Sequence, residues 1–237
     1  MKVEIWSDVM CPFCYIGKRR FEKALAAFLH SGDIEVIWKS FQLNPGMKTE
    51  PGKSINQYLA EVKGWSLEQA KQANDYVTNM ASEVGLQYDF DKAVVANSFD
   101  AHRVVQLAKT HGKGDAMEEQ LFKAYFTEGK NIADHPTLIA LATGIGLDRD
   151  AVKHTLESDQ YADAVEQDIY ESHQIGVKGV PFFVFNDRYA ISGAQATETF
   201  AGALEQAWGE WSKQKPVLKD ISSKDASSIC TTDGECK

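Results

Sequence analysis

Two cysteines separated by two residues stand close to the start of this 237-residue chain, in the segment Cys11-Pro12-Phe13-Cys14. A β-prone apolar run over residues 2–7 precedes the pair, and apolar residues at helical spacing follow it at once. Pro12 suits the first turn of a helix, where its missing N–H costs nothing. The free N–H groups and the dipole of that turn favour a thiolate over a thiol at Cys11. The pattern predicts redox chemistry in which Cys11 attacks a substrate sulfur and Cys14 resolves the mixed disulfide.

A structural zinc site is the main alternative for this pair, because Cys-Pro-x-Cys also occurs in zinc-binding knuckles. Tetrahedral zinc needs four ligands, and the only other cysteines of the chain are Cys230 and Cys236. Both lie in the tail of residues 214–237, which at about 3.3 Å for each extended residue is long enough to reach the first pair. They are either an accessory redox pair that relays electrons to or from the first pair, or an exposed pair without a catalytic role or a simple local disulfide. We favour redox chemistry and expect no metal.

The predicted elements place the first two cysteines in a small α/β unit. The first strand, the helix after Cys11 and a second strand at about residues 34–43 form a β–α–β unit. From residue 54 to 176 the signals are helical and no convincing strand is found. Ser54 is expected to cap one helix, and Ser66 with Gln69 forms a capping box for the next.

Strands return near the C-terminus at residues 180–185 and 189–193, joined by a tight turn at Asn186-Asp187, and a final helix runs to Trp211. The order β–α–β, helical block, β–β–α predicts one small α/β domain that is interrupted by a large all-helical insertion. Because the last residues lose periodicity and gain Ser, Lys and Asp, we expect a flexible tail. The predicted parts are an N-terminal half (1–50), the helical insertion (51–176), a C-terminal half (177–213) and the tail (214–237).

Composition and charge exclude several classes of function. The net charge of −9 argues against nucleic acid or an anionic membrane as the main partner. No run approaches the roughly 18 apolar residues of a membrane span, and the first residues lack the apolar segment of a secretory signal. We therefore expect a cytoplasmic protein. In a reducing compartment a Cys-x-x-Cys pair is catalytic or metal-binding rather than structural.

Four separated motifs connect the chain with a known family, and they occur in the order SDVMCPFCYIGKRRFE, FQLNP, NSFDAHR and GVKGVPFFVFN. The pattern resembles the thioredoxin fold, and within it the DsbA family with its helical insertion after the second strand. Over about residues 2–211 the chain is similar to the cytosolic FrnE-like branch of that family. The resemblance implies a thiol–disulfide oxidoreductase or protein disulfide isomerase that acts on cysteines of other proteins. Its only redox group would be its own disulfide, with glutathione or a thioredoxin-type protein as electron donor or acceptor.

The resemblance also assigns roles to residues around the dithiol. Pro181 takes the position of a cis-proline that faces both cysteines, which leaves the backbone of Val180 to pair with an extended substrate. His102 and Arg103 stand in the NSFDAHR helix, which is expected to overlook the cleft. Both are therefore candidate contacts for substrate or glutathione.

Two departures from related families bear on the direction of the chemistry. DsbA itself has a His inside its Cys-x-x-Cys, whereas this chain has Phe13 after Pro12. Without that His the Cys11 thiolate loses a cationic stabiliser, so we expect a less oxidising reduction potential than in the His-containing type. Proteins of similar architecture, the kappa-class glutathione transferases and 2-hydroxychromene-2-carboxylate isomerases, have Ser at the first position. A glutathione-dependent transferase or isomerase of small molecules is the alternative function, and the presence of both Cys11 and Cys14 argues against it.

Overall fold

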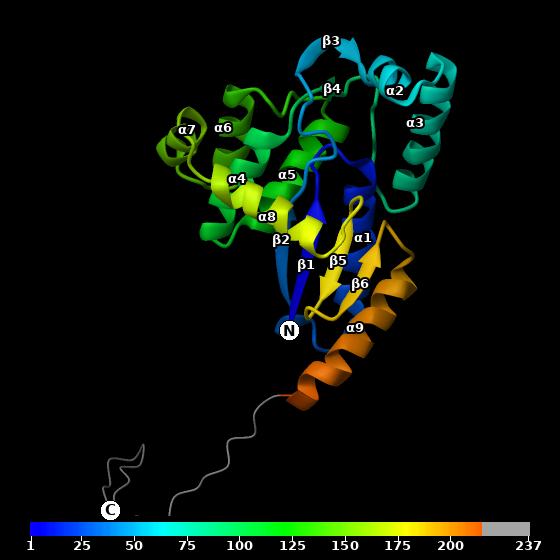
Figure 1. Cartoon of the computed structure of the whole chain (residues 1–237), viewed down its shortest axis with the longest axis vertical. Coiled ribbons are helices and arrows are strands. Elements are labelled where there is room, and N and C mark those ends of the chain that lie inside the picture. Colours follow the sequence, from blue (N-terminus) through cyan, green and yellow to red (C-terminus); the bar gives the residue numbers. More distant parts are fainter. Residues whose placement is uncertain (215–237) are drawn as a thin grey trace, which may run out of the picture.

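The computed structural model describes residues 1–214, and a four-stranded sheet of order β2-β1-β5-β6 forms its centre. β1 is parallel to β2 and antiparallel to β5, which in turn pairs antiparallel with β6. Figure 1 shows this sheet in the lower half of the described part and the helices of the insertion above it. The protein thus has the thioredoxin fold, with an insertion between its β–α–β and β–β–α halves. In chain order the elements are β1 (Lys2–Ser7), α1 (Pro12–Ala27), η1 (Ser31–Asp33), β2 (Glu35–Ser40), β3 (Glu50–Ser54), α2 (Ile55–Lys63), α3 (Leu67–Ser82), β4 (Val94–Val95), α4 (Phe99–Thr110), α5 (Gly114–Phe126), α6 (His135–Gly144), α7 (Arg149–Glu157), α8 (Ala162–Gln174), β5 (Phe182–Phe185), β6 (Tyr189–Ser192), α9 (Thr197–Trp211) and η2 (Ser212–Gln214).

One face of the sheet packs against α1 and α9. Alternate residues of β1 and β5 point to this face, because side chains along a strand alternate between its two sides. The rings of Phe21 and Phe200 pack against that of Phe183 with centroids 5.6 and 4.6 Å away. Burial of each such ring stabilises the fold by about 1.5–3 kcal/mol, which fixes α1 firmly on the sheet. The fully buried members of this core include Val3, Ile5, Phe183, Phe185, Phe200 and Leu204.

The other face of the sheet is covered in part by α8 of the insertion, where the Trp6 indole donates to the Asp168 carbonyl at 2.8 Å. The insertion helix α5 contacts β2 from the face of α1, because Trp38 shares the core of that face with Ile5 and its indole donates to Asp115 at 2.9 Å. A second and larger hydrophobic core forms inside the insertion, and the first turn of α1 reaches into it. Cys11, Cys14 and Tyr15 are members of this second core. The ring of Tyr15 stacks on that of Phe122 at 4.9 Å. The dithiol therefore lies at the junction between the sheet domain and the insertion.

The local signals at three helix and turn positions are confirmed. Ser54 and Ser66 each cap a helix through a reciprocal capping box, the second of them with Gln69. Asn186 and Asp187 both have positive φ angles, of 51° and 55°. Two consecutive residues in this region form the tight hairpin turn that joins β5 to β6.

The prediction that the insertion is free of strands is wrong in one detail. β3 and β4 pair antiparallel at the edge of the insertion, with Glu50 opposite Val95. β3 contains Pro51 and Gly52, residues that are depleted in strands, and β4 has only two residues. Neither segment is long or regular enough to give a period of two.

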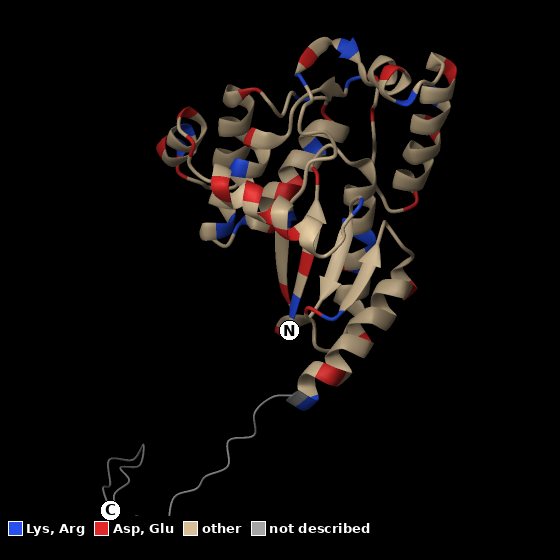
Figure 2. Ribbon diagram, viewed as in Figure 1, with Lys and Arg blue, Asp and Glu red and all other residues tan. Residues whose placement is uncertain are grey.

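Charged residues are interspersed over the described part of the protein, and acidic side chains gather along α8 (Figure 2). Lys39 of β2 neutralises part of this group, with its ammonium 2.8 Å from Asp168 and 2.7 Å from Glu171. Among residues 1–214, no helix combines the length and the apolar character needed to cross a membrane.

Candidate active site

The dithiol begins the helix α1. Cys11 is the N-cap residue, with extended backbone angles, and Pro12 follows at the first helical position. The turn is closed by backbone hydrogen bonds from Cys11 N–H to the Asp8 carbonyl (2.9 Å) and from Cys14 N–H to the Cys11 carbonyl (3.0 Å). The hydroxyl of Tyr88 donates to the Pro12 carbonyl at 2.7 Å, which ties this turn to the insertion. Both cysteines are free thiols, 3% and 1% exposed.

The loop before β5 lies directly against the first thiol. The Val180–Pro181 peptide bond is cis, as the resemblance implied. The Cys11 thiol donates to the Val180 carbonyl, with 3.4 Å between sulfur and oxygen. Gly17 lies on the other side of Pro181, and a Cβ atom at residue 17 would stand 3.0 Å from the proline ring. The sequence IGKRR thus contains a positional requirement that pattern reasoning missed, namely a residue without a side chain where α1 meets this loop.

The two thiols differ in their surroundings. Burial holds the pKa of the Cys14 thiol well above its ordinary value, and the adjacent Cys11 sulfur acts in the same direction. The Asp8 N–H and the Ser7 hydroxyl act against this effect. Cys14 is accordingly held as a protonated thiol behind Cys11. This asymmetry suits an attacking sulfur in front and a resolving sulfur behind it.

Asp8 anchors the segment between β1 and the dithiol. One carboxylate oxygen accepts a hydrogen bond from the Met10 N–H at 3.2 Å, and the other accepts from the Leu43 N–H at 2.8 Å. The residue is buried, and both bonds go to backbone groups. Asp8 therefore joins the turn before α1 to the chain that follows β2.

Arg103 does not occupy the substrate-facing position that we expected for it. Its side chain is buried, and the Nε atom donates to the Gln160 carbonyl at 3.0 Å. One terminal nitrogen lies 2.8 Å from the Asp100 carboxylate, and the other donates to the carbonyls of Thr155 and Ser158. These contacts satisfy the guanidinium and fasten α4 to the last turn of α7 and to the chain between α7 and α8. The expectation that Arg103 contacts the substrate is therefore wrong, and its role is structural.

His102 is enclosed as well, but it faces the back of the dithiol segment. Its Nε2 atom lies 3.5 Å from Asp8, too far for a good hydrogen bond, and neither ring nitrogen has a hydrogen-bond partner among the described residues. Burial lowers the pKa of His102, but Asp8 and then Glu118 and Asp168 outweigh it, so that the pKa is raised. Because the ring is fully buried, the expected contact of His102 with substrate is also incorrect.

Glu118 of α5 completes this buried polar group and was not expected from the sequence. Burial raises the pKa of its carboxyl to about 7, against the opposing charge of His102. One of its oxygens and the Tyr125 hydroxyl have no hydrogen-bond partner in residues 1–214. Glu118 stands one helical turn before Leu121 and Phe122, on the buried face of α5. An acid on an apolar helical face is the signal that would have revealed it.

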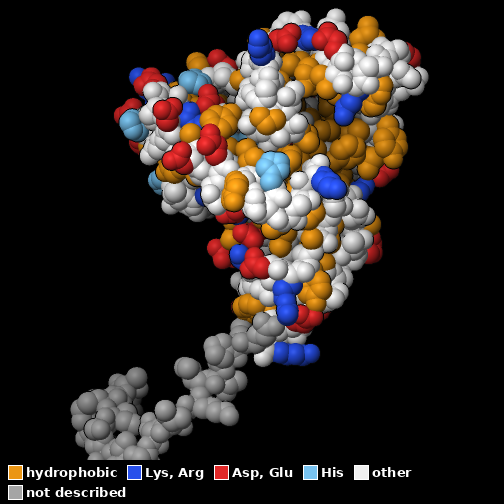
Figure 3. Space-filling model, viewed as in Figure 1, with side chains coloured by type: hydrophobic (Ala, Val, Ile, Leu, Met, Phe, Trp, Pro, Cys, Tyr) orange, Lys and Arg blue, Asp and Glu red, His pale blue; other side chains and the backbone are white. Residues whose placement is uncertain are grey.

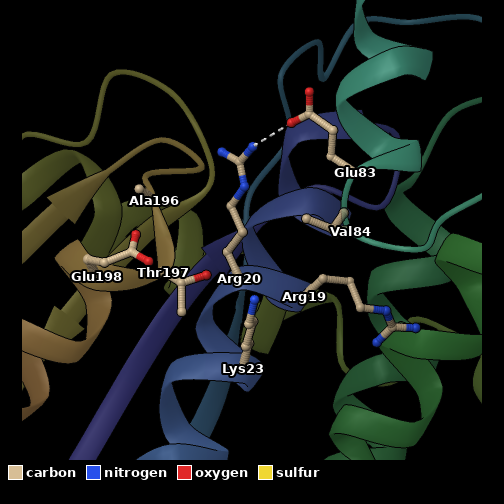
Figure 4. A pocket seen from close by; sticks show the side chains of 8 residues that line it. All are labelled: Arg19, Arg20, Lys23, Glu83, Val84, Ala196, Thr197 and Glu198. Carbon is tan, nitrogen blue, oxygen red and sulfur yellow. Dashed lines mark ion pairs between the residues drawn. The ribbon is translucent and has the colours of Figure 1, made fainter.

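A hollow of about 430 Å³ lies beside the middle of α1, away from the thiols. Figure 4 shows three cationic side chains of α1 around it, with Arg20 directed toward Glu83 at 3.9 Å. Arg20 also donates to the Ala194 carbonyl at 2.6 Å. Arg19 is paired with Glu22 at 2.7 Å. The Arg20 contacts hold α1 to the end of α3 and to the loop before α9, whereas the Arg19–Glu22 pair lies within α1. The hollow has no cysteine in its lining.

Metal binding finds no support within residues 1–214, where no group of three or more His, Cys, Asp or Glu side chains is placed to hold an ion. A zinc site built on the dithiol would need ligands from Cys230 and Cys236. Both of these residues, and the predicted tail that carries them, lie outside the described residues.

Two proteins are similar to this chain over most of its length. The probable DsbA oxidoreductase SCO1869 of Streptomyces coelicolor is 40% identical, with a TM-score of 0.84 over 99% of this chain and 97% of that one. The uncharacterized protein YwbO of Bacillus subtilis is 30% identical over 85% of this chain and 94% of its own length.

More distant structures share the fold alone. They include a 2-hydroxychromene-2-carboxylate isomerase (19% identity, TM-score 0.61, 90% of this chain and 97% of that chain). The cytosolic disulfide reductase DsbM of Pseudomonas aeruginosa is another (17% identity, TM-score 0.59, 90% of this chain and 98% of that chain).

The family model of the DSBA-like thioredoxin domain matches residues 2–205. The chain therefore belongs to the family of DsbA-like thiol oxidoreductases.

Proposed function

We propose that this protein is a thiol–disulfide oxidoreductase, with protein disulfide isomerase activity, that acts on cysteines of other proteins. Cys11 is the attacking sulfur and Cys14 the resolving one. The contact of 3.4 Å between the Cys11 thiol and the Val180 carbonyl supports this most directly. It places the attacking sulfur beside a backbone edge to which an extended substrate can pair, while Cys14 is enclosed behind it.

In the reducing direction the Cys11 thiolate attacks one sulfur of a substrate disulfide. The bond from Cys11 to that sulfur forms as the substrate S–S bond breaks, and the released thiolate takes up a proton. Cys14 then loses its proton and attacks the Cys11 sulfur, which releases the second substrate thiolate and leaves a Cys11–Cys14 disulfide. The substrate gains two electrons and the protein loses two, which glutathione or a thioredoxin-type protein would return. In the oxidising direction the same steps run in reverse.

The experiment is turnover of a disulfide-bonded protein by the wild type, Cys11→Ser and Cys14→Ser. We expect no turnover from Cys11→Ser, because the attacking sulfur is missing. Cys14→Ser should accumulate a mixed disulfide between Cys11 and the substrate, because the resolving thiol is missing. Dithiothreitol should cleave this complex. Turnover by Cys11→Ser at the wild-type rate would refute the assignment.

A glutathione-dependent small-molecule isomerase is the competing function, and the distant likeness to such an isomerase supports it only through the fold. The buried second thiol favours a two-cysteine cycle instead, since Ser at the first position could not form a disulfide. Isomerisation of a small substrate that survives in Cys11→Ser would support the competitor. Cytoplasmic location, which the name of the cytosolic DsbM suggests, is part of the proposal, as is a potential less oxidising than that of a His-containing dithiol.

A further inference from the structure

The face of the sheet opposite α1 and α9 is only partly covered by residues 1–214. α8 lies over β1 and β2 on this face, whereas β5 and β6 are open on the same side (Figure 1). The strand register places Phe182 and Val184 on the side of Trp6, because Phe182 pairs with Trp6, and places Ala190 there as the partner of Val184. Ala190 is exposed, and Phe182 and Val184 are half-buried.

A hollow of about 510 Å³ lies on this open part of the face. Its floor is apolar and consists of Trp6, Phe182, Val184, Ala190 and, after the end of α8, Ile175, which is 50% exposed. Charged side chains form the rim, where Lys2 lies 3.0 Å from Asp187 and Lys39 lies 2.7 Å from Glu171. Figure 3 shows hydrophobic side chains between charged ones on this face. Because the rim charges are paired with one another, the hollow fits an apolar chain segment rather than an ion.

The described part of the chain ends close to this hollow. Arg188 belongs to the rim and lies 2.8 Å from Glu210 of α9. Glu210 also accepts a hydrogen bond from the Tyr189 hydroxyl of β6. Gln214 follows Glu210 by four positions, which is about 6 Å along a helix. Residue 215 therefore begins near the end of the hollow at which the turn joins β5 to β6.

The chain beyond Gln214 starts with its most apolar stretch, residues 216–221 (PVLKDI). Val217, Leu218 and Ile221 lie in this stretch, whereas residues 222–237 contain one large aliphatic residue, Ile229. Six extended residues span about 20 Å, enough to cross a face made by strands of four residues.

A segment of the same chain suits this hollow better than a second copy of the protein. A tether of a few residues gives the segment an effective concentration on the order of millimolar at the hollow. A stable interface between two copies would instead need to bury about 800 Å² on each partner, far more than a short segment must cover.

We propose that residues 216–221 dock in this hollow, with their large aliphatic side chains on its apolar floor. Since the segment starts beside Arg188, it runs toward Phe182, two residues from the Val180 carbonyl that contacts Cys11. The docked segment thereby leads the second cysteine pair, Cys230 and Cys236, toward the dithiol end of the sheet. This inference does not depend on the dithiol chemistry proposed above.

Limited trypsin digestion of the full-length protein tests the docking, because the tail offers two matched cleavage sites. Lys219 lies inside the proposed segment and Lys224 lies outside it, and Asp follows both of them. Initial rates at the two sites are measured by mass spectrometry under reducing conditions. A synthetic peptide of residues 214–237 gives the intrinsic ratio of the two rates. A docked segment must open before it is cleaved, so we expect the ratio of Lys219 to Lys224 cleavage to be at least about tenfold lower in the protein, which corresponds to about 90% docked.

Ala190→Asp and Ile175→Asp each place a charge on the apolar floor and should return the ratio to that of the peptide. Val217→Asp acts from the tail, leaves residues 1–214 unchanged, and should do the same relative to its own peptide. Leu29→Asp is the matched control, because Leu29 is an exposed apolar residue that does not line the hollow, and the wild-type ratio should persist. Each variant is compared only where its circular dichroism spectrum equals that of the wild type.

The same ratio in the wild-type protein and the peptide would overturn the docking. A low ratio that survives both Ala190→Asp and Ile175→Asp would place the segment elsewhere and overturn this site. Protection of Lys219 that disappears on dilution of the protein would show that a second copy supplies the segment, which would overturn the intramolecular contact.

Discussion

Replacement of Glu118 by Gln should change how the stability of this protein depends on pH. The Glu118 carboxyl is buried on α5, and burial raises its pKa to about 7 from an ordinary value of 4.5. The folded protein therefore binds the proton more tightly than the unfolded chain does. The tighter proton binding of the folded state contributes fully to the unfolding free energy below pH 4.5, and this contribution is lost as the pH rises through 7. Above about pH 7 the ionised group destabilises the fold by about 3 kcal/mol, at about 1.36 kcal/mol for each pH unit between the two values.

The amide of the variant carries no ionisable proton, so Glu118→Gln should gain stability relative to the wild type as the pH rises. Between about pH 5.5 and 8 this relative gain amounts to about 2 kcal/mol. The assay is urea unfolding at both pH values, followed by circular dichroism, with the difference in unfolding free energy between variant and wild type as the readout. The raised pKa of His102 adds a slope of the same sign to both proteins, because its stabilising proton is also lost as the pH rises.

Glu119→Gln is the matched control on the same helix. Burial raises the pKa of Glu119, but hydrogen bonds from Arg19 and Tyr15 outweigh it, and the pKa is lowered. The ionised Glu119 carboxylate therefore stabilises the fold at pH values above the pKa that Glu119 has in the unfolded chain. This stabilisation is lost only at more acidic pH. Glu119→Gln should thus lower stability by a similar amount at both pH values. A flat difference for Glu118→Gln as well would show that Glu118 is ionised throughout this range, and the reasoning from burial would be refuted.

Three further changes test other parts of the site. Arg103→Met should lower the unfolding free energy in urea by about 3 kcal/mol, because it leaves buried carbonyls without a donor, and an effect below about 1 kcal/mol would contradict the structural role. Gly17→Ala should destabilise by about 1–2 kcal/mol and slow disulfide turnover, since its Cβ would press on Pro181 at 3.0 Å. Gly32→Ala, where no atom lies within 4 Å, is its control and should show neither effect. Phe13→His should make the dithiol more oxidising in equilibration with glutathione, because an imidazolium would stabilise the Cys11 thiolate; an unchanged equilibrium would contradict the role of residue 13.

The features that the sequence predicted well depend on local signals. Ser66 and Gln69 lie three residues apart, and their capping box is visible in the sequence because it needs no distant partner. The Cys-x-x-Cys spacing is local in the same way. Pro181 is different, since its assignment came from the resemblance and from no property of the run VPFFVF itself.

The environment of the dithiol could not be predicted, because it is built by residues far apart in the sequence. His102 was placed near the site by its motif, but its burial depends on how α4 packs against its neighbours, α5 among them. Packing between helices that are distant in the sequence decides whether a charged side chain faces a cleft or is buried beneath its surface. Arg103 illustrates the same limit, since its partners at residues 155, 158 and 160 lie more than 50 positions further along the chain.

The insertion explains why two cysteines on one helical turn differ. In an isolated helix both thiols would face water. The helix dipole alone would then favour the thiolate form of Cys11, the N-terminal of the two, by a modest amount. Here the hydrophobic core of the insertion encloses both cysteines, together with Tyr88 and Phe122, and burial raises the pKa of the Cys14 thiol. The same insertion supplies one wall of a groove beside the first turn of α1 through α2 and α3, and of the two cysteines Cys11 alone lines it. The packing of the insertion against α1 therefore gives the two sulfurs different positions, with Cys11 at the groove and Cys14 behind it.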